Sequence, residues 1–310
     1  MKEDELIPRF RDFPSVAVLI ATHNPNMEFL REQLNSIARQ KYVRKTIYWC
    51  DDNSNQENLI EATAIFSEFH HIRVHLPNGK FGVNENFLNL LKAADKTGIS
   101  HYAFSDQDDL WHPEKLARHI QGLLHHDKEV AASHSKVTAF GIVKKPFVVD
   151  RCQSHMLRTL LAENCAQGCT MVLNVHAREL VLSADPLGIS WYDWWIATVV
   201  AIKGKLVLID GTDTFYRIHE DNLVGVQTLK KRLNRVINRD SGKNLSQAQN
   251  LLKFAKDNLE LGAEKEIDRW IRGHTGSLMT RVKFALTDRK RRLRTADDFL
   301  RRILDLIRIP

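Results

Sequence analysis

The chain has 310 residues, of which 43% are hydrophobic and 27% are charged. Because domains run to roughly 100–200 residues, this length indicates one large domain or one domain with an appendage. The longest apolar runs, Val16–Ala21 and Ile196–Ile202, are far shorter than the roughly 20 residues that a membrane-spanning helix needs. The charged segment Met1–Glu5 is followed by no apolar stretch, so we expect no secretory signal and a cytoplasmic protein.

Charge is divided unevenly along the chain. Residues 1–220 carry 24 Lys and Arg against 27 Asp and Glu, whereas residues 221–310 carry 21 against 11. The basic surplus therefore belongs to the C-terminal third, which is where we expect any acidic partner to touch.

The four cysteines form no CxxC pair and have no histidines at zinc-ligand spacing; they are Cys50, Cys152, Cys165 and Cys169. This spacing argues against a zinc site or a disulfide framework. We expect reduced thiols, most of them buried.

The first 130 residues alternate between strand and helix patterns. Apolar runs predict strands at Val16–Thr22, Thr46–Cys50, His71–Leu76 and His101–Ser105. Helical spacing follows each of them, at Met27–Gln40, Glu57–Phe69, Asn84–Ala94 and Glu114–His126. Four such units in a row predict a parallel sheet with helices on both faces.

Beyond residue 130 the pattern is less regular. It predicts strands at Val130–Ala139 and Thr170–Asn174, helices at Ser154–Ala162 and Tyr192–Ile202, and a closing strand pair, Lys205–Ile209 and Thr212–Arg217, around Gly211. After about residue 224 only helical periodicity remains, at Gln227–Asn238, Ser246–Leu261, Glu264–Ile271 and Thr295–Ile307. We therefore expect one domain over residues 1–224 and a basic helical region over residues 225–310.

Polar and acidic residues gather where the predicted strands end. These loops hold Thr22-His23-Asn24, Asp51-Asp52, Asn78-Gly79 and Asp106-Gln107-Asp108. In parallel sheets, ligands bind outside the carboxyl ends of the strands, so these loops are the candidate site.

The strongest motif is Asp106-x-Asp108, which is followed directly by Asp109. Two carboxylates at a strand end can hold a hard divalent cation, and such a cation can stabilise a diphosphate leaving group. The alternative is an acidic helix start, which the helix dipole favours anyway. Mutual repulsion among three carboxylates favours the cation. By themselves, Asp51-Asp52 and Thr22-His23-Asn24 fit simple turns at least as well.

Taken together, the four loops resemble family 2 glycosyltransferases of the GT-A fold. The resemblance rests on Ala21-Thr22-His23-Asn24, Asp51-Asp52-Asn53-Ser54, Asn78-Gly79 and Ser105-Asp106-Gln107-Asp108-Asp109-Leu110-Trp111 with Pro113 and Lys115. It covers about Ser15 to Gly225. It implies an α/β catalytic domain with a mostly parallel sheet, a nucleotide-binding half at about 15–130 and an acceptor-binding half at about 131–224.

The resemblance also implies roles for these residues. A donor nucleotide would be bound by Thr22, Asn24, Asp51, Asp52, Asn78, Gly79 and Asp106. Asp108 would be the principal ligand of Mn²⁺ or Mg²⁺, with Asp106 as a second ligand. An acceptor or sugar pocket would include Asp109, Trp111, Gly168, Trp191 and Trp194.

Three further residues have competing interpretations. Asp193, in Trp191-Tyr192-Asp193-Trp194-Trp195, resembles the family's catalytic base; otherwise it caps a buried helix. His219 could reach the metal or the diphosphate, and Arg217 could offset the diphosphate charge; otherwise they are a loop histidine and a surface ion-pair residue. His119 is expected on the exposed side of its helix, without a metal role.

The tail contains Arg289-Lys290-Arg291-Arg292-Leu293-Arg294 beside an amphipathic helix. Residues 281–310 therefore either contact an anionic membrane or pack an apolar face on the domain. The cluster lacks interleaved aromatic residues and any recognisable module, so no nucleic-acid partner is expected.

The predicted function is an inverting glycosyltransferase that moves a sugar from a UDP- or dTDP-linked donor to a saccharide or lipid-linked saccharide. The motif versions resemble bacterial polysaccharide enzymes, including rhamnosyl- and galactosyltransferases of O-antigen assembly. The alternatives are a metal-dependent nucleotide hydrolase or nucleotidyltransferase, and a non-catalytic binding module for sugar nucleotides or nucleic acid. The oligomeric state, the donor sugar and the acceptor are left open.

Overall fold

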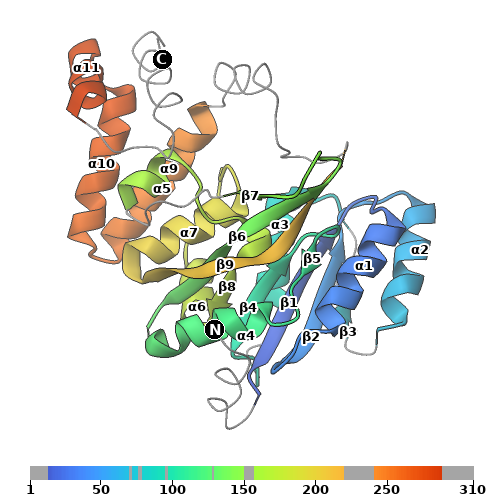
Figure 1. Ribbon diagram of the computed structural model, residues 1–310. Coiled ribbons are helices and arrows are strands. Elements are labelled where there is room, and N and C mark those ends of the chain that lie inside the picture. The colour runs from blue at the N-terminus through green and yellow to red at the C-terminus, as the bar shows by residue number, and fades with distance from the viewer. Residues whose placement is uncertain are drawn as a thin grey trace.

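A computed structural model describes residues 13–69, 72–75, 79–94, 97–127, 129–149, 157–219 and 241–287. The described residues build one nine-stranded sheet in the order β3-β2-β1-β4-β8-β6-β9-β5, with β7 beside β6 (Figure 1). Its strands are β1 (Ser15–Thr22), β2 (Arg44–Asp51), β3 (Ile72–His75), β4 (His101–Ser105), β5 (Leu110–Trp111), β6 (Ala131–Gly141), β7 (Phe147–Val149), β8 (Val172–Asn174) and β9 (Lys205–Ile218).

The first four strands pair in parallel, as the sequence predicts. The helices that connect and follow them are α1 (Met27–Ala38), α2 (Gln56–Ser67), α3 (Gly82–Ala93) and α4 (Lys115–Leu123), which continues as the 3₁₀ turn η3 (Leu124–His126). Asn26 and Asn55 begin α1 and α2, because their side chains accept the backbone N–H groups of Phe29 and Asn58. The predicted β–α alternation is thus confirmed, and the strand over His101–Ser105 coincides with β4.

The second half of the sheet is mixed. β8 runs antiparallel to β4 and to β6, whereas β9 runs parallel to β6 and antiparallel to β5. Since β8 is antiparallel to both β4 and β6, these two strands run in the same direction, and β9 runs with them. The carboxyl ends of β4, β6 and β9 therefore lie at one edge of the sheet. That edge also holds the loops that follow β1 and β2.

The predicted strand pair around Gly211 is wrong. Lys205–Ile218 is one strand of 14 residues, β9, which pairs with β6 along its length. Gly211 has φ +86, and the register shifts around Lys136 on the facing strand. The glycine therefore forms a bulge within a continuing strand instead of reversing the chain.

The described helices of the second half are α5 (Leu157–Ala162), the 3₁₀ turn η4 (Gly168–Thr170), α6 (Val175–Ser183), α7 (Tyr192–Lys203), α9 (Ser241–Asp257), α10 (Leu261–Thr275) and α11 (Leu278–Thr287). The sequence predicts α5, α7, α9 and α10 within a few residues of these bounds and misses α6, α11, β5 and β7. The predicted helices at Gln227–Asn238 and Thr295–Ile307 lie outside the described residues.

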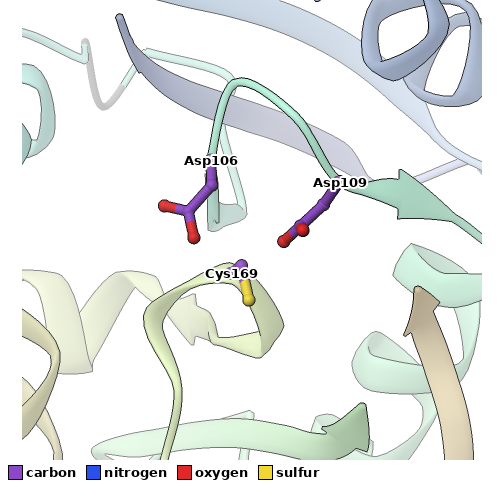
Figure 2. A group of neighbouring side chains, drawn as sticks. All are labelled: Asp106, Asp109 and Cys169. Atoms are coloured by element: carbon purple, nitrogen blue, oxygen red, sulfur yellow. The ribbon is translucent and has the colours of Figure 1, made fainter. Parts of the chain in front are cut away.

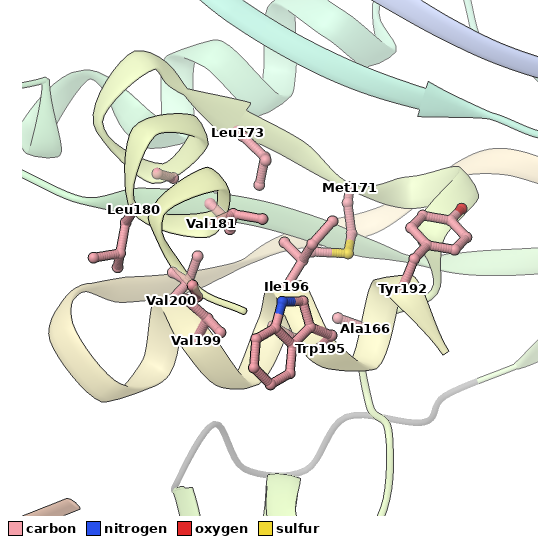
Figure 3. Packing of buried hydrophobic residues seen from close by; sticks show 14 of the residues in the cluster. Ala166, Met171, Leu173, Leu180, Val181, Tyr192, Trp195, Ile196, Val199 and Val200 are labelled. Atoms are coloured by element: carbon pink, nitrogen blue, oxygen red, sulfur yellow. The ribbon is translucent and has the colours of Figure 1, made fainter. Parts of the chain in front are cut away.

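Each face of the sheet carries its own apolar core. On β1, Val16, Val18 and Ile20 face α1, α2 and α4, whereas Ala17 and Leu19 face α3, α6 and α7. Figure 3 shows the second core, where Trp195, Ile196, Val199 and Val200 of α7 pack against Met171, Leu173, Leu180 and Val181.

The described C-terminal helices join this second core. Leu251 and Phe254 of α9 and Ile267 and Trp270 of α10 belong to the same cluster as α7, and α9 and α10 lie beside α7 and α5 (Figure 1). Up to Phe284, the chain therefore follows the packing alternative. The basic cluster at 289–294 lies outside the described residues.

Within the described part, no helix combines the length and apolar character that a membrane crossing requires. The thiols of Cys50, Cys165 and Cys169 are reduced and buried, as predicted. Cys152 lies outside the described residues.

Candidate active site

The loop between β4 and β5 carries the acidic motif and is tied to the neighbouring strand end. Gln107 accepts the backbone N–H of His23 at 2.8 Å and donates to the carbonyl of His23 at 3.3 Å. The amide thus fixes the acidic loop to the loop after β1. The sequence places Gln107 in the motif but carries no signal for this contact, which spans 84 positions.

Two of the three carboxylates in this loop face a cysteine from η4. Figure 2 shows Asp106 and Asp109 pointing toward Cys169, and their ligand atoms all lie within 4.8 Å of one another. Asp109 is fully buried and accepts the backbone N–H of Arg217 at 3.0 Å through Oδ1. Among the described residues, no N–H or O–H group donates to its Oδ2.

Burial and like charge make this loop electrostatically unfavourable. Burial, then repulsion from Asp108 and Asp193, raises the pKa of Asp106 to about 7. The pKa of Asp109 lies well above its ordinary value, chiefly because the carboxyl is buried and also because the charges of Asp108 and Asp106 repel it. A positive charge placed among these oxygens would relieve the repulsion.

The oxygens of this loop fit a hard divalent cation better than the thiol does. Burial raises the pKa of Cys169 well above its ordinary value, so the sulfur keeps its proton and is a poor ligand. Carboxylate oxygens are the ligands that Mg²⁺ and Mn²⁺ prefer. The undonated oxygen of Asp109 and the adjacent Asp106 are therefore compatible with such an ion.

The structure brings His219 to the third carboxylate of the loop. Nε2 of His219 lies 2.6 Å from Oδ2 of Asp108, and its ring contacts Phe29 with centroids 5.7 Å apart. This pairing places a nitrogen ligand beside the residue expected to be the principal metal ligand.

Arg217 clamps the acidic loop from the side. Its guanidinium donates to the Asp108 carbonyl at 2.8 Å and to Glu32 at 2.5 Å, and lies over the rings of Phe29 and Phe140. The bond to Asp108 joins the acidic loop to β9, and the bond to Glu32 joins β9 to α1. Its expected role toward a diphosphate therefore competes with a structural one.

Asp193 lies in the first turn of α7, where two backbone groups hold its carboxylate. Gly168 N–H donates to Oδ2 at 3.0 Å and Trp194 N–H donates to Oδ1 at 2.7 Å. Both bonds fix the direction of the carboxylate. The helix cap is Trp191 and not Asp193.

Gly168 is required by a close approach within the protein. A Cβ at this position would lie 1.9 Å from the hydroxyl oxygen of Tyr192. The sequence assigns this glycine to sugar approach, but the structure gives the Tyr192 ring as the observed neighbour.

The loops after β1 and β2 form a hydrogen-bonded unit. Buried Thr22 donates to Asp51 at 2.8 Å and accepts from the indole of Trp49 at 2.9 Å. Buried Asp51 also accepts the backbone N–H and the hydroxyl of Ser54. Thr22 and Asp51 therefore shape the loop from within, as in the turn alternative.

Asp52 and Asn24 lie nearer the surface of this unit. Asp52 Oδ1 accepts the backbone N–H groups of Phe81 at 2.7 Å and Gly82 at 3.0 Å, beside Gly79. Asn24 is exposed, with φ 40, and accepts the backbone N–H of Asn55 at 2.9 Å. Asn78 lies outside the described residues.

The three tryptophans expected in the acceptor or sugar pocket differ in placement. Trp191 is exposed beside Asp193, whereas Trp111 and Trp194 are buried. Trp111 packs in the core under the Lys115 ammonium, and Trp194 donates to the carbonyl of Leu160. Neither buried indole offers a face to a sugar in this structure.

A buried polar network lies behind the acidic loop, and the sequence misses it. His119 is fully buried between Ser133 Oγ at 2.9 Å and Asp213 Oδ2 at 3.0 Å. The expectation that His119 faces solvent is therefore wrong, because the side of α4 that carries it packs against β6 and β9.

Lys115 is fully buried at the start of α4. Its ammonium donates to the carbonyl of Cys169 and lies 3.8 Å from the centroid of the Trp111 ring. Burial lowers its pKa to about 8, against the attraction of nearby carboxylates. Lys115 thus joins α4 to the η4 turn that holds Asp193.

Comparison with known proteins identifies this arrangement. Residues 17–154 match the family model described as glycosyl transferase family 2. Over these residues, somewhat less than half of the chain, the protein is similar to family 2 glycosyltransferases. It is therefore an enzyme of the glycosyltransferase class.

A curated relative agrees with this similarity. The chain is 28% identical over 288 residues to the dTDP-rhamnosyl transferase RfbG of Shigella flexneri, and the match covers 88% of this chain and 95% of the relative.

Solved structures show that the fold is GT-A. S. aureus TarS 1-349 in complex with UDP-GlcNAc has a TM-score of 0.54 at 12% identity, covering 94% of this chain and 90% of that one. TarS 1-349 in complex with UDP has a TM-score of 0.51 at 14% identity, with the same coverage of both chains.

Proposed function

We propose that this glycosyltransferase moves a sugar from a dTDP- or UDP-linked donor to a saccharide acceptor, with inversion at the anomeric carbon. The product would be a bacterial surface polysaccharide such as O-antigen. The similarity to a protein named as a dTDP-rhamnosyl transferase favours dTDP-rhamnose as the first donor to test. The observation that carries the proposal is the gathering of acidic side chains at one sheet edge, where Asp106 lies close enough to Asp108 and Asp193 for their charges to interact and His219 pairs with Asp108.

The donor nucleotide lies, in this proposal, across the loops after β1 and β2. Asp52 is the carboxylate of these loops that remains near the surface, and it is oriented by the N–H groups at the start of α3. Asn24 stands beside it on the neighbouring loop. The Asp52 carboxylate can accept hydrogen bonds from a base or a ribose hydroxyl, and the Asn24 amide can donate or accept them.

Asp106 and Asp108, with His219 as a further ligand, would hold a divalent cation against the donor diphosphate. A bound cation neutralises the charge that develops on the leaving diphosphate. His219 Nε2 and Asp108 Oδ2 bond to each other at 2.6 Å, so in this proposal both atoms exchange that bond for the cation.

Asp193 is the proposed general base. Two backbone N–H groups fix the direction of its carboxylate. It takes the proton of the acceptor hydroxyl while that oxygen bonds to the anomeric carbon and the bond to the donor phosphate breaks. The exposed ring of Trp191 beside it offers a face on which an acceptor sugar can stack.

The test is release of nucleoside diphosphate from dTDP-, UDP- and GDP-sugars, with Mn²⁺, Mg²⁺ or EDTA. We expect one donor to react with metal only, Asp108→Ala to lose the reaction, and Asp193→Asn to lose turnover while calorimetry still detects donor binding. Asp257→Asn, at an exposed position on α9, is the matched control.

Two results would overturn the proposal. If no donor binds with metal, the acidic edge is not a sugar-nucleotide site. If the donor is hydrolysed at an unchanged rate in Asp193→Asn, the chain acts as a nucleotide hydrolase that does not use this base.

A further inference from the structure

An exposed hairpin projects from the edge of the sheet that carries the site. β6 turns through residues 142–146 into β7, with Ala139 opposite Phe147 and Val137 opposite Val149. Three large apolar side chains of this hairpin are exposed: Ile142 by 68%, Phe147 by 40% and Val148 by 56%. Phe147 and Val148 are consecutive in β7 and point to opposite faces, so the hairpin carries exposed apolar side chains on both of its faces and in its turn. Exposed apolar side chains gathered on one projecting hairpin mark a surface that meets a partner.

On the face of the sheet that carries Val148, a row of side chains continues across the neighbouring strands. Val148 pairs with Thr138, Thr138 with Phe215, and Phe215 with Leu110. Directly paired residues of adjacent strands point to the same face of a sheet, so these four side chains form one row. Phe215 in this row is 36% exposed.

Two lysines lie in the turn between the exposed apolar residues. Lys144 and Lys145 are both exposed, and they separate Ile142 from Phe147. A short apolar surface with cations at its margin matches the boundary of an anionic bilayer, where the apolar groups enter the acyl region and the lysines meet headgroups. A purely apolar protein partner would leave these two charges without a counterpart.

The hairpin borders the candidate active site. Ile142 N–H donates to the carbonyl of Ile218 at 3.0 Å, and the next residue, His219, is paired with Asp108. In Figure 1, β6 and β9 run together to the edge where this hairpin lies. A surface held by the hairpin would therefore lie beside the reacting groups.

We propose that the β6–β7 hairpin docks this protein on an anionic lipid bilayer, so that the site meets an acceptor whose saccharide is carried by a membrane lipid. The acceptor part of this inference rests on the proposed function. The docking surface differs from the basic tail at residues 281–310, because it adjoins the site and is formed by the catalytic sheet itself.

The experiment is co-sedimentation of the full chain with phosphatidylcholine vesicles, with and without phosphatidylglycerol. Two paired variants test the hairpin: Ile142→Ser with Phe147→Ser, and Lys144→Glu with Lys145→Glu. Two matched controls change exposed residues elsewhere: Leu259→Ser with Leu261→Ser, and Lys253→Glu with Lys256→Glu. We expect both hairpin variants to bind anionic vesicles at least about tenfold more weakly and both controls to bind as wild type.

Each outcome is decisive for the hairpin. If wild type does not bind anionic vesicles, the proposal fails. It also fails if the hairpin variants bind like wild type, and the tail is then the better membrane candidate. If the hairpin variants instead dissociate a dimer in sedimentation velocity without changing vesicle binding, the surface contacts a second copy. Nucleoside diphosphate release in solution, measured on the same variants, confirms that they fold and tests the proposed function separately.

Discussion

Replacing Asp106 by asparagine should stabilise the folded chain while abolishing its activity. Burial and the charges of Asp108 and Asp193 raise the pKa of Asp106 to about 7. A carboxyl that holds its proton more tightly when folded than when unfolded lowers the stability of the fold as the pH rises. Asparagine keeps the shape and carries no charge, so it removes this cost.

The size of the effect follows from the two pKa values. Between 3.8 in the unfolded chain and about 7 in the folded one, each unit corresponds to about 1.36 kcal/mol, so the full cost above pH 7 is about 4 kcal/mol. Asp106 is only partly buried, and solvent screening reduces this to about 2 kcal/mol. The cost is absent below pH 3.8, grows through the interval up to 7, and is constant above it.

The assay is urea unfolding followed by tryptophan fluorescence, in EDTA, at pH 5 and pH 7.5. We expect Asp106→Asn to exceed wild type in free energy of unfolding by about 2 kcal/mol at pH 7.5 and by less at pH 5. Asp210→Asn, on an exposed position of β9, is the control and should match wild type. A variant that is no more stable than wild type at pH 7.5 would refute the electrostatic account of this loop.

Three further changes test other parts of the site. Burial alone would raise the pKa of Asp213, but the charge of His119 and its hydrogen bond help to lower that pKa to about 2. Asp213→Asn should therefore cost about 2 kcal/mol of unfolding free energy at pH 7, and the gap should narrow as the pH falls from 3.8 toward 2 in urea titrations. Lys115 lowers the pKa of Asp106, so Lys115→Met should move the pH–rate midpoint upward and lower kcat about tenfold, whereas Lys115→Arg should restore the midpoint. Gly168→Ala places a Cβ 1.9 Å from the Tyr192 hydroxyl. It should lower the free energy of unfolding by about 1–3 kcal/mol, which a lower melting temperature would show, and it should reduce kcat more than it weakens donor binding.

The sequence predicts the N-terminal half well because its signals there are local. Buried parallel strands appear as continuous apolar runs, and each run is closed by the polar residues that begin the next helix. The second half depends on pairing between distant segments. β5 and β7 have two and three residues, too few for any periodicity, and Gly211 has the same composition signal in a bulge as in a turn.

The acidic residues of the site are visible in the sequence, but their surroundings are not. Nothing local shows that Lys115 reaches a carbonyl 54 positions away or that His119 meets an aspartate 94 positions away. The same applies to Trp111, which a motif assigns to a pocket and the fold places in the core. A motif identifies the residue types, and contacts across the sheet decide which of them remain accessible.

Asp213 and Asp106, which both interact with Lys115 of α4, show how the chain distributes its counter-charges. Asp213 has His119, Lys115 and Ser135 as partners, and its pKa falls to about 2. Asp106 faces two further carboxylates, and its pKa rises to about 7 in spite of the same Lys115. The fold therefore provides cationic partners for the carboxyl behind the site and leaves the one at its surface undercompensated. An uncompensated acid costs stability, and this cost is recovered when a positive charge binds. The electrostatics of the acidic loop therefore favour a ligand that brings a positive charge, as the metal-bound sugar nucleotide of the proposed function would.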